Sequence, residues 1–141
     1  MSTGTCGCSE DTRFAAIRRI DAGADNIRGG IFDIRFGLNS IESGFITAGT
    51  NRCCEGAADC AEGARDIAAG LRVLRPELSR AERRETCEGL RDIQRGIFGI
   101  NEGVRRVRQG NFQRGICMIE AGKCSISEGL ADILGALCGI L

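Results

Sequence analysis

Residues 20–44 read IDAGADNIRGGIFDIRFGLNSIESG, and glycine recurs in this stretch every seven residues. Isoleucine stands three residues before each of these glycines, and another aliphatic residue, such as Ile31 or Leu38, often follows directly. Because spacings of three and four place side chains on one side of an α-helix, isoleucine and glycine occupy positions a and d of a heptad. The stretch therefore predicts a long helix whose contact surface consists partly of bare backbone.

The same spacing continues along the chain and then repeats at an offset of 66 residues, so that Gly23 matches Gly89 and Phe32 matches Phe98. So many matches without a gap indicate a duplicated helical hairpin. We expect the glycines at the d positions to let facing helices pack closely, namely Gly23, Gly30, Gly37, Gly56, Gly63, Gly70, Gly89, Gly96, Gly103, Gly122 and Gly129.

The spacing is interrupted at Gly44 and Gly110, which predicts tight turns at two helix ends. Pro76 is expected to end the second helix, and Ser79 with Glu82 forms a capping-box pattern that begins the third. Four rods of equal length joined by short connections predict an antiparallel bundle.

The sequence thus predicts an all-α fold, a duplicated antiparallel helical hairpin arranged as a four-helix bundle or as two hairpins side by side. Residues 1–11 are expected to form a flexible arm that carries Cys6 and Cys8, with Asp11 or Thr12 capping the first helix. Residues 12–141 then form a single helical domain of two repeats, 12–75 and 78–141.

Glycine in the interior of a helix lowers the stability of that helix. In a helix interior it is less favourable than alanine by roughly 0.8–1 kcal/mol, so about a dozen such positions approach the whole stability of a small domain. We expect close helix contact to offset this cost, because aliphatic side chains of a facing helix can then rest against bare backbone. The alternative is that the glycines only leave room for bulky neighbours.

Composition argues against several classes of protein. The chain has 19 basic and 19 acidic residues, which gives no electrostatic case for nucleic acid. It lacks histidine, the usual general base, as well as tyrosine and tryptophan, so we expect no enzyme, no cofactor and no small-molecule substrate. The amino terminus lacks the apolar segment of a signal peptide, and no apolar stretch is long enough to span a bilayer. We therefore expect synthesis in the cytoplasm.

Nine cysteines need an explanation in such a chain. Cys53 and Cys60 occupy a positions and are interpreted as small buried hydrophobes. The others lie at outward positions or on the arm, with Cys117, Cys124 and Cys138 assigned to one outer row of the last helix. We predict that they form disulfides between subunits, the candidates being Cys6, Cys8, Cys54, Cys87, Cys117, Cys124 and Cys138.

Three phenylalanines are also expected at the surface. Phe32 and Phe98 lie at outward f positions matched by the duplication, and Phe36 lies close to Phe32. Large apolar groups repeated at outward positions predict a contact surface between copies of the chain.

These features favour a non-enzymatic structural protein that assembles with itself into a filament, sheet or shell layer and is locked by disulfides. A bacterial spore coat, exosporium layer or spore appendage is a setting that combines synthesis inside a cell with later oxidation at a surface. One alternative is a cytosolic bundle that binds Cu(I) or zinc through thiolates, although the chain has no Cys-x-x-Cys motif. A second alternative is a membrane-active glycine zipper, which the charges in nearly every heptad argue against.

Overall fold

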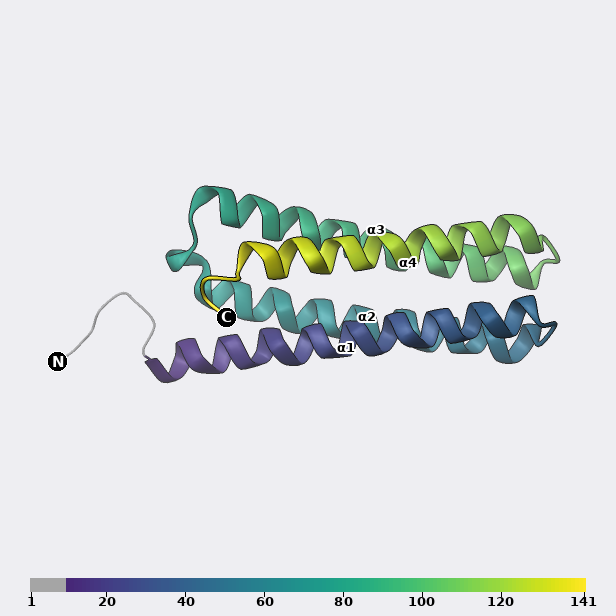
Figure 1. Ribbon diagram of the computed structural model, residues 1–141, viewed down its shortest axis with the longest axis horizontal. Helices are drawn as coiled ribbons and strands as arrows, with labels where there is room; N and C mark the ends of the chain where they lie inside the picture. Colours follow the sequence, from purple (N-terminus) through teal and green to yellow (C-terminus); the bar gives the residue numbers. More distant parts are fainter. Residues whose placement is uncertain (1–9) are drawn as a thin grey trace.

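The structure, a computed structural model, describes residues 10–141 and is all-helical over that range. It contains four long helices, α1 (Glu10–Glu42), α2 (Ile46–Leu74), α3 (Arg80–Arg108) and α4 (Phe112–Ala136), and a short 3₁₀ turn, η1 (Arg75–Glu77), between α2 and α3. Figure 1 shows them as two antiparallel hairpins, α1–α2 and α3–α4, laid side by side in one bundle. The predicted fold class is confirmed.

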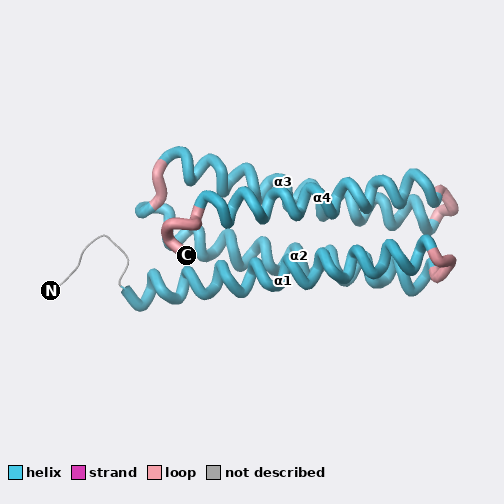
Figure 2. The backbone as a smooth tube through the Cα atoms, viewed as in Figure 1, coloured by secondary structure: helices cyan, strands magenta, loops and turns pink. Residues whose placement is uncertain are grey.

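Each helix occupies one corner of the bundle. Helix α1 packs against α2 and α4, while α3 packs against α4 and α2, so α1 and α3 lie at diagonal corners. The turns within the two hairpins lie at the same end of the bundle, and η1 and the chain's last residues lie at the other (Figure 2). Equivalent residues of the two hairpins are therefore at similar heights.

A glycine lies in the turn of each hairpin, as predicted. Gly44 has φ of 95° and Gly110 has φ of 93°, a left-handed backbone conformation that side chains disfavour. In the first turn, the N–H of Gly44 donates to the carbonyl of Ile41 at 3.0 Å, which satisfies one of the last carbonyls of α1.

One predicted helix boundary is confirmed, and two others are wrong. At α3, the Glu82 N–H donates to Ser79 Oγ at 3.1 Å and the Ser79 N–H donates to the Glu82 carboxylate at 2.8 Å, which completes the capping box. Helix α1 already includes Glu10, so Asp11 and Thr12 lie inside it rather than at its cap. Helix α4 ends at Ala136, so Cys138 lies in the turn that follows and not in an outer row of that helix.

Glycines from the two helices of a hairpin meet backbone to backbone. A Cβ atom added to Gly30 would lie 2.5 Å from the carbonyl oxygen of Gly56, and one added to Gly56 would lie 2.5 Å from that of Gly30. The second hairpin repeats this arrangement at Gly96 and Gly122, again at 2.5 Å. No real Cβ fits at such distances, so glycine is required by the closeness of the two helices.

Aliphatic side chains pack against these glycines along each hairpin. We call this line of glycine and aliphatic contacts between the two helices of a hairpin the seam. The same added Cβ on Gly56 would lie 2.8 Å from Cγ1 of Ile34, and one on Gly122 would lie 2.8 Å from Cγ1 of Ile100. Both explanations of the glycines therefore hold together, since they bring the backbones into contact and also make room for the facing isoleucine. Dispersion contacts across this seam offset the helix-propensity cost.

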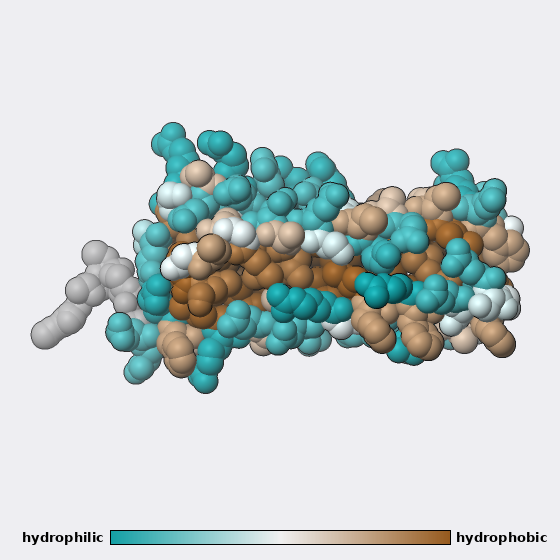
Figure 3. Space-filling model, in the orientation of Figure 1, coloured by the Kyte–Doolittle hydropathy of each residue, from teal (hydrophilic) through white to brown (hydrophobic). Residues whose placement is uncertain are grey.

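The two hairpins meet in a different way. Residues that directly follow the seam glycines, including Ala64, Leu90 and Ile97, line the α2–α3 junction, and Ile31 and Leu130 line the α1–α4 junction. These contacts are made by side chains, and grooves remain open along both junctions. Figure 3 shows an apolar strip along the α1–α4 junction.

Adjacent glycines on α1 provide a test of the seam. We expect Gly30→Ala to lower the free energy of unfolding by about 1–3 kcal/mol, because the new methyl group would overlap backbone that no rotamer change can move. Gly29→Ala is the matched control, since a Cβ there meets nothing within 4 Å. It should raise stability by up to about 1 kcal/mol through helix propensity.

Urea denaturation followed by circular dichroism measures both values. Equal effects of the two substitutions would contradict a seam built on backbone contact.

Candidate functional site: surface aromatic and thiol groups

All six phenylalanines of the chain lie at the surface. Their exposed fractions run from 45% to 67%, whereas the buried core consists of isoleucine, leucine, valine, alanine and cysteine. A folded chain ordinarily buries most of its aromatic side chains, because they contribute the largest apolar area per residue. Here that area is left in contact with water, as at an interaction surface.

Phe32 and Phe36 form an ordered pair on α1. Their ring centroids are 6.4 Å apart, and the Arg52 guanidinium lies 4.6 Å from the centroid of Phe36. Arg52 is held from its other side by an ion pair with Asp33 at 2.9 Å. A salt bridge and a cation–π contact thus support the exposed pair, so part of its side-chain entropy is already lost before any partner binds.

Phe98 gives the second hairpin an equivalent group. It is 67% exposed on α3, at the corner diagonal to α1. The two hairpins are not identical here, because Glu102 stands where the first hairpin has Phe36. The three phenylalanines expected at the surface are therefore all exposed, and they are divided between opposite corners of the bundle.

Sequence reasoning missed the other three phenylalanines. Phe14 lies on α1 beneath Arg18, whose guanidinium is 5.1 Å from the ring centroid. Phe45 directly follows a turn glycine, and Phe112 begins α4 in register with the seam but remains 45% exposed at the end of the bundle. The exposure of Phe45 could have been predicted from its position directly after the turn glycine Gly44, because a side chain in a turn has few neighbours to pack against.

The cysteines fall into two groups. Cys87, Cys117, Cys124 and Cys138 are exposed and Cys54 is half-buried, whereas Cys53 and Cys60 are buried. Cys117 and Cys124 lie one heptad apart on α4, about 10 Å along the helix and too far apart to bond to each other. Cys6 and Cys8 lie outside the described residues.

The two buried thiols are held in their protonated form. The Sγ atoms of Cys53 and Cys60 lie 3.7 Å from the carbonyl oxygens of Ile34 and Ile27, which their S–H groups can reach. Burial raises the pKa of each thiol from its ordinary value of 9.0 to about 12. Since metals bind the thiolate, these two groups are poorly suited to be ligands.

Residues 10–141 have neither a cluster of metal ligands nor a helix suited to cross a membrane. No group of three or more cysteine, aspartate or glutamate side chains lies close enough together there to hold a metal ion. None of the helices in this range has both the length and the apolar character needed to cross a membrane.

Comparison with models of protein families, with curated proteins and with solved structures finds no match for this chain.

The raised thiol pKa values predict a loss of stability in alkali. A group that holds its proton more tightly when folded stabilises the protein fully below its ordinary pKa and loses that contribution as pH rises. We therefore expect the free energy of unfolding to fall between about pH 9 and pH 12. The chain has no tyrosine and one lysine but seven other cysteines, so the contribution of Cys53 and Cys60 is isolated by comparison with a variant that keeps those seven.

The double variant Cys53→Ile, Cys60→Ile is the control, because the second hairpin carries Ile119 and Ile126 at these positions. Its geometry is suitable, since a Cβ on Gly30 would lie 2.6 Å from Cys60 Sγ and one on Gly96 would lie 2.6 Å from Ile126 Cγ1. Urea midpoints measured from pH 8 to pH 11 should fall less steeply in the variant. An equal slope in both proteins would refute the assignment to these thiols.

Proposed function

We propose that the chain is a non-enzymatic structural protein that assembles with copies of itself, first through exposed aromatic groups and then through disulfides between subunits. The observation that carries this proposal is the placement of all six phenylalanines outside a core of aliphatic residues. Covering them removes a large apolar area from water, with a gain of roughly 25 cal/mol for each Å² buried.

The positions of these groups favour open-ended assembly. Phe32 and Phe36 project from the α1 corner and Phe98 from the diagonal α3 corner, so contact groups face opposite sides of one molecule. Because the two aromatic groups differ in composition, a contact between unlike sides of successive copies is favoured. Contacts of this kind add subunits without closing into a pair, and produce filaments or sheets.

The exposed thiols then supply covalent links. Cys117 and Cys124 lie on the outside of α4, a corner next to both aromatic corners. Each disulfide forms from two thiols of different copies, which lose two protons and two electrons to an oxidant such as dioxygen, itself reduced to hydrogen peroxide. Such thiols stay reduced inside a cell and are oxidised when the material is released, as on a spore surface.

The experiment separates the two stages of assembly. Protein purified in reductant is exposed to air and analysed by non-reducing gel electrophoresis and negative-stain microscopy. We expect ladders of covalent multimers, and fibres or sheets that form before the disulfides do. Phe32→Ser with Phe98→Ser should reduce assembly in reductant at least tenfold, because it removes one contact group from each side. Leu141→Ser is the matched control, since it removes another exposed apolar side chain at the chain end.

Cys117→Ser with Cys124→Ser should leave the microscopic assemblies intact but shorten the covalent ladders. A single monomeric species with free thiols after days in air would overturn the proposal. Equal assembly by the aromatic variant and the original chain would remove its main support.

A further inference from the structure

A continuous apolar groove runs along the α2–α3 junction. It is made of two hollows, of about 200 Å³ and 270 Å³, which share Ala68 and Leu90 as lining residues. Its floor includes the small and aliphatic side chains of Ala61, Ala64 and Ile97, and Arg65 and Gln94 also line this part of it. The small residues matter because each alanine leaves space that a longer side chain would fill.

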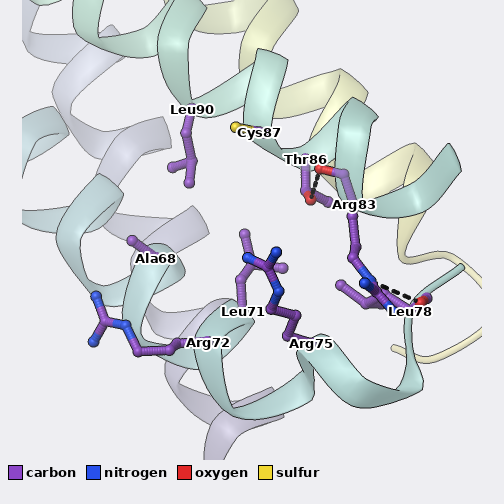
Figure 4. A pocket seen from close by; sticks show the side chains of 9 residues that line it. All are labelled: Ala68, Leu71, Arg72, Arg75, Leu78, Arg83, Thr86, Cys87 and Leu90. Carbon is purple, nitrogen blue, oxygen red and sulfur yellow. Dashed lines mark hydrogen bonds between the residues drawn. The ribbon is translucent and has the colours of Figure 1, made fainter. Parts of the chain in front are cut away.

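One end of this groove is surrounded by arginine. Figure 4 shows Arg72 and Arg75 on the α2 side and Arg83 on the α3 side, with Leu71 and Leu90 between the two sides. No aspartate or glutamate lines either hollow. A cluster of one sign around an apolar surface repels itself, and no acidic side chain lining the groove offsets that repulsion.

Arginines at this end of the bundle differ in pairing, and Arg80 and Arg84, like the three arginines of the groove, form no ion pair within residues 10–141. Arg13 and Arg19, at the same end of the bundle, pair with Glu77 at 2.7 Å and with Asp66 at 3.2 Å. Within residues 10–141, by contrast, Arg72, Arg75 and Arg83 form no ion pair, although the Arg83 side chain donates to the carbonyl of Leu78. The guanidinium groups of Arg72 and Arg75, and the terminal amino groups of Arg83, are thus available to an anion at one end of the groove.

The duplication provides an internal comparison. The equivalent groove at the α1–α4 junction, of about 320 Å³, is also mainly apolar and is lined by Ile31, Leu130 and Leu134, with a single arginine, Arg28, that pairs with Asp25. At the offset of 66 residues, however, Arg72, Arg75 and Arg83 correspond to Cys138, Leu141 and Ile17. Within residues 10–141, both junctions between the hairpins therefore have a mainly apolar groove, and of these two only the α2–α3 groove has the arginine cluster.

We infer that the α2–α3 groove binds a long-chain fatty acid, with the hydrocarbon chain on the apolar floor and the carboxylate among Arg72, Arg75 and Arg83. From Ala61 to Arg75 the helix advances by about 21 Å at 1.5 Å per residue, a length suited to an extended acyl chain of about sixteen carbons. Guanidinium groups match a carboxylate with paired hydrogen bonds. The groove has no aromatic side chain for stacking a base. The inference does not depend on self-assembly.

Binding is measured on the full chain in reductant, with palmitate labelled with ¹³C at its carboxyl carbon and kept below the concentration at which it forms micelles. We expect a saturable change in the carboxyl resonance with one site per chain. Arg72→Gln with Arg75→Gln should weaken binding about fivefold to tenfold, because it removes two partners of the carboxylate. Arg80→Gln with Arg84→Gln is the matched control, since these exposed arginines of α3 do not line the groove, and it should have little effect.

Ala64→Leu tests the floor of the groove. Leu130 occupies the equivalent position of the second hairpin, so the fold accommodates leucine there, and circular dichroism checks that it does. This variant should weaken palmitate binding while leaving the binding of octanoate, which needs less of the floor, nearly unchanged. A competition experiment with 1-hexadecanol should show at least tenfold weaker binding than palmitate.

Three results would overturn the inference: no saturable binding of palmitate, equal binding by the Arg72→Gln, Arg75→Gln variant and its control, or equal binding of the alcohol and the acid. Binding to anionic phospholipid vesicles without binding of monomeric palmitate would likewise overturn it, because the occupant would then be a membrane surface.

Discussion

Contact between the backbones of two helices is the constraint on which the rest of this structure depends. At Gly30 and Gly56, and again at Gly96 and Gly122, an added Cβ would lie 2.5 Å from the facing carbonyl oxygen. Because nothing but hydrogen fits between the helices at these points, each hairpin is a pair of rods in direct contact. Glycine is a poor helix former, so this contact must recover a cost of roughly 1 kcal/mol at each position. The pairing of glycine with isoleucine along the seam shows how, since the space left by one residue is filled by the side chain of another.

This closeness also decides which residues can be inside. An aromatic ring needs more room than a seam of glycine and isoleucine provides, so no phenylalanine packs there, and all six phenylalanines are at the surface. The chain thus stabilises its hairpins with small residues and leaves its largest apolar groups available for contacts with other molecules. The exposed phenylalanines thus link the fold to the proposed self-assembly.

The two hairpins share one seam but differ elsewhere. Cys53 and Cys60 occupy the places of Ile119 and Ile126 without changing the packing, since all four side chains rest against a glycine of the facing helix. Outside the seam the hairpins have diverged: the arginine cluster of the α2–α3 groove has no counterpart at the α1–α4 junction, and Cys117 and Cys124 have none on α2. Divergence at the surface is where separate functions can arise, because substitutions there do not disturb the contact between helices.

The sequence by itself determined the four helices, their turns at Gly44 and Gly110, the capping box at Ser79 and the buried positions of Cys53 and Cys60, because each follows from local chemistry or a strict period. Only the tertiary structure decided that the glycine seams close each hairpin and that residues directly after a glycine, such as Ala64 and Leu130, line the junctions between hairpins, since a heptad pattern specifies a contact surface but not its partner. The same limit applies to the groove. Arg72, Arg75 and Arg83 belong to three different elements, and nothing in their spacing shows that they surround one apolar hollow until η1 turns the chain back on itself.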